Sequence, residues 1–182
     1  MMKIFFFVLV LAGLLVTGAP GADTKPDPLS GAFDPEQVLL NLEATVKARD
    51  WKRYADFLAP GFRFVPFAAI PTDYPGVDWE QWDRKQEIVF IRELVGPDRG
   101  AVLDLSGRIL DKGRESHGKA EWDLVYTIES MGQVFTSRAV FVFQKIDNLW
   151  YLAAWTDTTI EIEEDTARPL PTSGSLRGAL SW

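Results

Sequence analysis

Residues 120–160, AEWDLVYTIESMGQVFTSRAVFVFQKIDNLWYLAAWTDTTI, decide the fold. Apolar and polar residues alternate through most of this stretch, which is the period of β-strands that bury one face. Two short interruptions, Met131-Gly132 and Asp147-Asn148, have the composition of two-residue hairpin loops. The stretch therefore predicts three consecutive antiparallel strands, over residues 120–128, 134–146 and 149–160.

The two loops also predict how these strands pair. With Met131-Gly132 as the first loop, Ser130 pairs with Gln133, and the pairs further along the strands are Trp122 with Phe141, Leu124 with Ala139 and Ile128 with Phe135. With Asp147-Asn148 as the second loop, the predicted pairs are Phe143 with Leu152, Phe135 with Ile160 and Arg138 with Asp157. Both loops gather the large apolar residues on one face, which we expect to line the core.

A fourth strand precedes these three, because Leu103, Leu105 and Ile109 alternate after Gly100. The residues before Gly100 show helical spacing instead. Asp34 followed by Pro35 is a good helix start, and this first helix is predicted to run to Arg49.

Two further helices are expected in this half of the chain. Asp50 can cap a short second helix that stops before Pro60-Gly61, and a third helix is predicted from Trp79 to Val95. Phe62 and Phe64 alternate as a short strand between them, and residues 66–78, with three prolines, are expected to form a loop.

The order of elements is helix, helix, strand, helix and then four antiparallel strands. This segregation predicts an α+β domain in which a curved antiparallel sheet packs on N-terminal helices. We assign the domain to residues 34–160. Residues 22–33 are expected to be a flexible lead-in, and residues 161–182 an acidic, Pro-containing mobile tail.

Residues 1–21 have the form of a secretory signal peptide. Met1-Met2-Lys3 supplies a positive start, Ile4–Val16 is an apolar run, and small residues follow. The apolar run is too short to cross a bilayer core of about 30 Å at 1.5 Å per residue, so cleavage after Gly21 is favoured over a membrane anchor. We therefore expect a secreted or periplasmic protein, of bacterial type, with no membrane span after cleavage.

The composition excludes several classes of protein. The 182 residues contain no Cys and one His, His117, so thiol chemistry, disulfides and multi-histidine metal sites are excluded, and we expect no metal or cofactor. A net charge of −7 argues against a general nucleic-acid-binding surface. Any chemistry must therefore depend on carboxylates, Arg and Tyr.

The layout resembles the nuclear transport factor 2-like (SnoaL-like) superfamily. The resemblance rests on the element order, on Asp50-Trp51 leading to Leu58, and on the final hairpin from Lys145 to Trp155. It implies a cone-shaped sheet of the cystatin-like and nuclear transport factor 2-like type, an apolar pocket and frequent homodimers. The superfamily includes ketosteroid isomerases, scytalone dehydratases, polyketide cyclases and non-catalytic domains, so the resemblance implies no single activity.

The predicted register places a charged cluster on the face opposite the core. Arg138 lies opposite Asp157, with Asp123 on the diagonal, and Val140, Val142, Trp155 and Ala153 surround them. As a catalytic site, one carboxylate would act as general base while Arg138 kept the other ionised, as in a cofactor-free lyase, isomerase or hydrolase. The structural alternative is a cross-strand ion pair on a solvent or dimer face.

Two functions of different classes follow from these observations. The first is binding of a small apolar or amphipathic molecule in a pocket between sheet and helices. The second is a non-catalytic accessory or assembly domain that dimerises through Val140, Val142, Trp155 and their neighbours. Aromatic residues are the expected lining of the pocket: Trp51, Tyr54, Phe57, Trp82, Trp122 and Tyr126.

Overall fold

The computed structural model describes residues 31–158 and 172–181. The predicted signal peptide and most of the lead-in lie outside these residues. Helix α1 (Pro35–Lys47) begins where predicted, since the Asp34 side chain accepts a hydrogen bond from the Gln37 amide. Helix α2 (Trp51–Ala55) is capped in the same way by Asp50, whose side chain accepts from the Arg53 amide. No helix among the described residues is long and apolar enough to cross a membrane.

The next segment differs in detail from the prediction. Strand β1 (Leu58–Val65) contains Pro60-Gly61, and the predicted loop contains the short helix α3 (Ile70–Asp73). The predicted third helix is divided into a 3₁₀ turn, η1 (Trp79–Gln81), and helix α4 (Arg84–Leu94). The division has a local cause, because Asp83 and Gln86 form a reciprocal capping box that starts a new helix.

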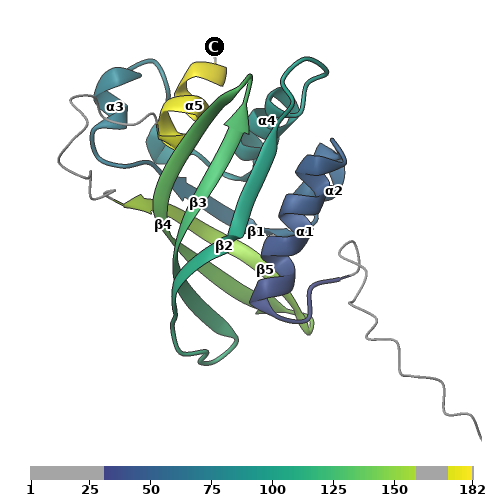
Figure 1. The fold of residues 1–182 in the computed structure, drawn as a ribbon. Coiled ribbons are helices and arrows are strands. Elements are labelled where there is room, and N and C mark those ends of the chain that lie inside the picture. The colour runs from purple at the N-terminus through teal and green to yellow at the C-terminus, as the bar shows by residue number, and fades with distance from the viewer. Residues whose placement is uncertain (1–30, 159–171, 182) are drawn as a thin grey trace, which may run out of the picture.

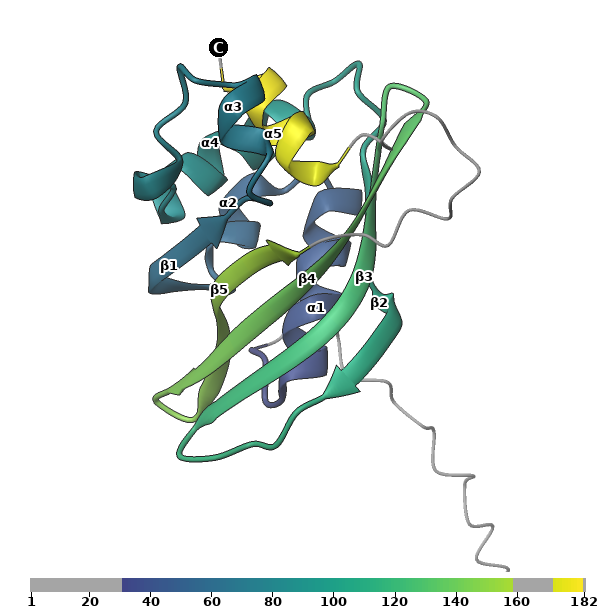
Figure 2. The same cartoon turned by 90° about the vertical axis from the view of Figure 1, so that its left-hand side faces the viewer.

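One five-stranded curved sheet contains all the strands, in the order β1-β5-β4-β3-β2. Its other members are β2 (Val102–Lys112), β3 (Lys119–Ser130), β4 (Gln133–Ile146) and β5 (Leu149–Thr158). β2 to β5 are antiparallel neighbours, as predicted, whereas β1 runs parallel to β5. Figures 1 and 2 show the sheet curving around an interior that is closed by the helices.

Both predicted hairpin loops are confirmed. Met131, Gly132, Asp147 and Asn148 all have positive φ, as two-residue loops of this kind require. The β3–β4 register is the predicted one from Ser130–Gln133 to Trp122–Phe141. The predicted pair Phe143–Leu152 is also present, while Ile160 lies outside the described residues.

The predicted β4–β5 register is wrong beyond the Phe143–Leu152 pair, because β5 contains a bulge at Ala153. Phe143 pairs with Leu152 but Val142 pairs with Ala154, so Ala153 has no partner. Because side chains alternate between faces, one extra residue reverses the orientation of everything that follows. Trp155 and Asp157 therefore point into the core, and Arg138 pairs with Thr158 instead of Asp157.

The chain ends in a helix that the sequence analysis did not predict. Ser173–Leu180 form α5, capped by the Thr172 side chain, within the segment expected to be a mobile tail. Figure 2 shows α5 beside α3 and α4 at the helical end of the sheet. Its side chains Ser173, Leu176 and Arg177 are all buried. Helix α5 thus completes the core of the domain.

Candidate functional site

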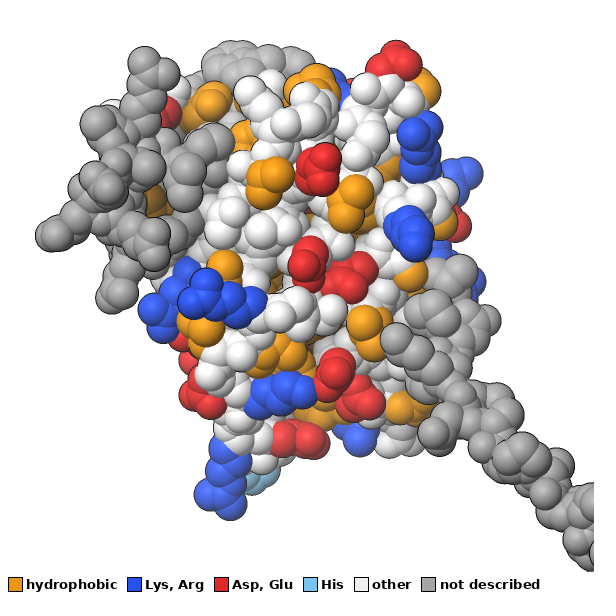
Figure 3. All heavy atoms as spheres, in the orientation of Figure 1, with side chains coloured by type: hydrophobic (Ala, Val, Ile, Leu, Met, Phe, Trp, Pro, Cys, Tyr) orange, Lys and Arg blue, Asp and Glu red, His pale blue; other side chains and the backbone are white. Residues whose placement is uncertain are grey.

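The outer face of the sheet carries the predicted pair of Asp123 and Arg138. Arg138 Nε donates to Asp123 Oδ1 at 2.9 Å and its Nη2 donates to Oδ2 at 2.5 Å, so the pair is bidentate. The two side chains are 24% and 41% exposed. The hydrogen bonds from Arg138 lower the pKa of Asp123 below its usual value. Figure 3 shows the surrounding surface as charged and polar groups interspersed with isolated hydrophobic side chains.

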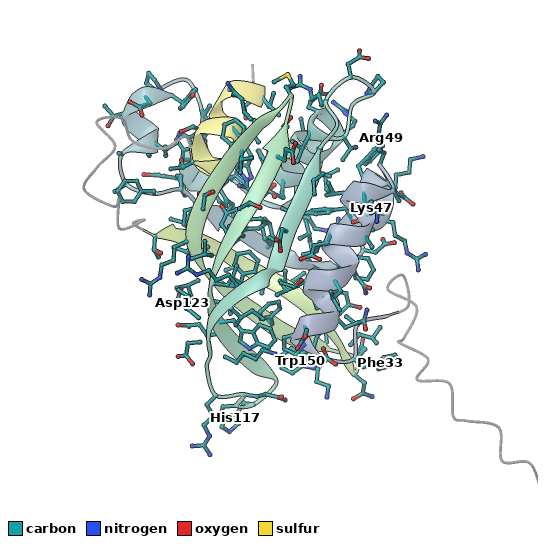
Figure 4. The ribbon with its side chains drawn as sticks, viewed as in Figure 1. Phe33, Lys47, Arg49, His117, Asp123 and Trp150 are labelled. Atoms are coloured by element: carbon teal, nitrogen blue, oxygen red, sulfur yellow. The ribbon has the colours of Figure 1, made fainter. Side chains whose placement is uncertain are left out.

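Asp157 is not part of this cluster. The bulge at Ala153 turns its side chain to the interior, where 5% of the residue is exposed. The structure therefore joins two of the three predicted catalytic residues and separates the third by the thickness of the sheet. His117, the single histidine of the sequence, lies exposed at the tip of the β2–β3 connection (Figure 4).

In the interior, Asp157 accepts hydrogen bonds from three side chains. The donors are Tyr126 Oη at 2.6 Å, Trp155 Nε1 at 3.1 Å and Ser173 Oγ at 2.8 Å. The Tyr126 and Ser173 hydroxyls also contact each other. Burial raises the pKa of Asp157, although Arg177 and the three donors oppose this effect. Burial, and then the Asp157 charge, raise the pKa of Tyr126.

A second buried carboxylate, Glu87 of α4, is paired with Arg177 of α5. Arg177 Nε donates to Glu87 Oε2 at 3.0 Å and Nη2 donates to Oε1 at 2.8 Å, while Trp82 Nε1 donates to Oε2 at 2.9 Å. Both charged side chains are fully buried. Arg177 Nη1 also donates to Ser173 Oγ at 3.1 Å, which connects Glu87 with Asp157 through α5.

Aromatic rings surround the Arg177 guanidinium. Its central carbon lies 4.0 Å from the ring centroid of Phe64, 4.4 Å from that of Trp155 and 4.7 Å from that of Phe90. These distances are those of cation–π contacts in a desolvated site. Burial alone would lower the pKa of Arg177, but the Glu87 carboxylate more than offsets this and the pKa is raised.

The hydroxyl of Tyr54 is buried beside the Glu87–Arg177 pair. Burial, and then the charge of Glu87, raise the pKa of this hydroxyl, so the Glu87 carboxylate is close to it. We name Glu87, Tyr126, Asp157 and Tyr54, with the rings around Arg177, the interior cluster.

The six aromatic residues expected to line a pocket lie in different environments. Tyr54, Phe57, Trp82, Trp122 and Tyr126 are buried and Trp51 is half-buried. Tyr54, Trp82 and Tyr126 belong to the interior cluster or contact it, whereas Trp122 packs against Phe143 elsewhere in the sheet. Trp82 also lines an outer cavity of about 290 Å³ with Lys85, Val89 and Phe90, and Phe57 lines another of about 240 Å³ beside Trp150.

Sequence reasoning missed Glu87 and Arg177. A signal for Glu87 was present, because it shares a helix face with Phe90, Ile91 and Leu94, where a charged residue needs a buried partner. Arg177 was hidden in the segment interpreted as a tail. The described residues contain no group of three or more acidic or His side chains suited to a metal ion.

No protein-family model matches the chain, and no curated protein sequence matches it. Solved structures do match in three dimensions. A protein from Novosphingobium aromaticivorans assigned as a scytalone dehydratase has a TM-score of 0.52 at 11% identity, over 75% of this chain and 89% of that one. The chain has the nuclear transport factor 2-like fold.

Two further structures support the nuclear transport factor 2-like fold. A Mycobacterium tuberculosis protein of unknown function matches with a TM-score of 0.53 and 10% identity, over 79% of each chain. A Thiobacillus denitrificans protein assigned as a calcium/calmodulin-dependent protein kinase type II association domain matches with a TM-score of 0.52 and 10% identity, over 72% of this chain and 99% of that one. At such identities the likeness establishes the fold and no activity.

Proposed function

We propose that this nuclear transport factor 2-like domain binds a small amphipathic molecule at the interior cluster, between sheet and helices. The main support for this proposal is that two carboxylates, Glu87 and Asp157, are buried within an aromatic interior. Buried ion pairs contribute little net stability compared with apolar packing, so stability alone gives no reason for them. Asp157 has a raised pKa in this apolar interior, and titratable groups of that kind are typical of binding and catalytic sites.

Helix α5 closes this site in the present structure. Ser173 and Arg177 project from α5 onto Asp157 and Glu87 and fill the space that a ligand would occupy. Binding therefore requires α5 to move, and the ligand replaces the contacts that α5 makes.

A catalytic form of the proposal uses Asp157 and Tyr126. A carboxyl of raised pKa beside a tyrosine hydroxyl can exchange a proton with a substrate and donate a hydrogen bond to a developing oxyanion. A cofactor-free lyase, isomerase or hydrolase reaction would suit these groups. Asp123 and Arg138 would take no part in it, since they lie on the outer face of the sheet.

Native mass spectrometry of the protein purified without denaturant tests the binding proposal. We expect a bound small molecule, or a higher melting temperature with 1-naphthol, in a variant whose α5 is weakened by Gly178→Ala. The matched control is Gly61→Ala, because a Cβ at Gly61 meets no atom within 4 Å. The proposal fails if the Gly178→Ala protein is folded but carries no bound small molecule in native mass spectrometry, and if no compound of a mixed panel of small molecules raises its melting temperature.

The second candidate is a dimerising accessory domain, favoured by half-buried Val140 and Val142 beside the Asp123–Arg138 pair on the outer face. Trp155, which the sequence analysis assigned to this surface, is in the core and takes no part. Native mass spectrometry reports the oligomeric state directly. A dimer that Val142→Glu converts to a monomer would support this candidate, and a monomeric wild type would exclude it.

We also propose that the domain works outside the cytoplasm, on the evidence of the signal-like residues 1–21. The mass of the protein recovered from the exporting cell tests this, since cleavage after Gly21 leaves Ala22 at the N-terminus. Recovery of the full-length chain from the cytoplasm would contradict it.

A further inference from the structure

The contacts of Arg177 resemble those of a bound ligand more than those of an ordinary core residue. A planar cation lies among three aromatic rings and donates two parallel hydrogen bonds to one carboxylate. This is the geometry by which guanidinium groups are recognised, because the planar fork matches a carboxylate and its faces stack on rings. Unlike most core side chains, this group comes from a short helix at the end of the chain.

Without Arg177 the interior cluster would contain two buried acidic groups without their cationic neighbour. Glu87 and Asp157 would remain, and among the described residues no other cation contacts either carboxylate. The Arg177 charge also lowers the pKa of both Asp157 and Tyr126. A buried carboxylate is stabilised either by a positively charged partner or by taking up a proton, and for Glu87 the partner here is Arg177.

Helix α5 is a short element that docks through a small set of contacts. It has eight residues, and residues 159–171 separate it from β5 in the sequence. Its glycines make the close packing on α3, with Gly174 against Ile70 and Gly178 against the Tyr74 ring. Its polar contacts to the rest of the domain are largely those that Ser173 and Arg177 make with the interior cluster.

We propose that the ligand of this domain is an organic cation with a planar guanidinium or amidinium head on an apolar body, and that Arg177 is its internal competitor. This inference rests on the proposed function and specifies its ligand class. The head takes the place of the Arg177 guanidinium on Glu87, between Phe64, Phe90 and Trp155. The buried Tyr54 hydroxyl lies near Glu87 and is a further polar group beside the head.

The test uses full-length Arg177→Ala and isothermal titration calorimetry with benzamidinium, against its neutral analogue benzamide. We expect the variant to bind benzamidinium at least tenfold more tightly than benzamide, and at least tenfold more tightly than the wild type does. Adding Glu87→Gln to Arg177→Ala should abolish the preference for the cation. Arg138→Ala, which removes the surface arginine, is the matched control and should bind benzamidinium no better than the wild type.

The outcomes separate this inference from the proposed function. If folded Arg177→Ala binds 1-naphthol and benzamide as well as benzamidinium, the interior is a ligand site but the cation assignment is overturned. If it binds none of them, both are overturned. If Arg177→Ala does not fold unaided, refolding is measured with each compound. Rescue by benzamidinium alone supports the inference, and rescue by benzamide to the same extent, or by neither compound, overturns it.

Discussion

The described part of the chain contains two bidentate arginine–carboxylate pairs that differ mainly in their surroundings. Arg138–Asp123 lies on the outer face of the sheet, with side chains 41% and 24% exposed, whereas both side chains of Arg177–Glu87 are fully buried. The outer pair joins neighbouring strands that already pair along their length. The inner pair joins two helices that lie far apart in sequence, and it replaces water with aromatic rings.

The comparison shows that burial changes how much stability is lost when one partner of the same kind of ion pair is removed. An exposed pair contributes about 0–1 kcal/mol and can be removed with little effect. A buried pair adds little net stability over apolar packing, yet removing one partner leaves an uncompensated charge. The inner pair therefore adds a charged contact to the packing that holds α5, and in our proposal it is the position that a ligand cation would take.

The largest expected effect comes from deleting Ala153, which removes the bulge that separates the two regions. Trp155 and Asp157 would then point outward and Asp157 would lie opposite Arg138, the arrangement of the simple hairpin. The core would lose Trp155, and burying a large aromatic side chain is worth about 3–5 kcal/mol. We expect no cooperative unfolding transition in calorimetry. A variant as stable as the wild type would show that the bulge does not determine the orientation of Asp157.

Arg177→Ala comes next and is compared with Arg138→Ala. We expect a loss of about 3 kcal/mol in the free energy of unfolding, at the low end for buried pairs because α5 can undock and let water reach Glu87. Arg138→Ala should lose no more than about 1 kcal/mol. Urea denaturation measures both. Similar losses in the two variants would mean that burial does not distinguish the pairs.

Gly178→Ala should weaken α5 without changing any charge. An added Cβ would lie 2.5–2.7 Å from carbons of the Tyr74 ring, so the helix must shift. Overpacking of this kind costs about 1–3 kcal/mol, partly offset by the better helix propensity of alanine. Thermal unfolding compared with Gly61→Ala measures the effect. An unchanged melting temperature would show that α5 does not pack closely on α3.

The smallest effect is a pH dependence of opposite sign at the two carboxylates. Asp123 has a lowered pKa in the folded state, so its stabilisation is present above the unfolded pKa of about 4 and is lost as pH falls. Asp157 has a raised pKa, so the folded state holds its proton longer and stability falls as pH rises through that range. As the pH rises from 3 to 7, the stability of Asp123→Asn relative to the wild type should therefore fall. Over the same range, the stability of Asp157→Asn relative to the wild type should rise.

Urea titrations at several pH values measure these differences. For the partly buried, solvent-accessible Asp123, the change in the free energy of unfolding between these pH values is expected to be on the order of 1 kcal/mol or less. Two variants with the same sign of pH dependence would contradict the placement of the carboxylates on opposite faces.

The sequence predicted the sheet well, because alternation and loop chemistry are local. Met131-Gly132 and Asp147-Asn148 fix both hairpins, and Asp34 and Asp50 mark the starts of two helices. The candidate site was predicted only in part. One unpaired residue, Ala153, decides the face on which Asp157 lies, and no local composition distinguishes a bulge there from a regular strand.

The partner of Glu87 was beyond local reasoning for a different reason. Arg177 lies ninety residues away in sequence, and its helix is stabilised by tertiary packing on α3 and α4. A short segment with two glycines and few apolar residues has no strong helical pattern of its own. The fold could therefore be predicted from the sequence, while the chemistry of its interior required the structure.

Native-state hydrogen exchange of α5 tests the central claim most directly. If α5 closes an interior site and can leave it, the amides of residues 174–180 should exchange through an opening that costs less free energy than global unfolding, while those of β3 and β4 exchange only by global unfolding. Benzamidinium should then increase exchange in α5 and leave β3 and β4 protected. Equal protection of α5 and the sheet strands, unchanged by benzamidinium, would contradict the account.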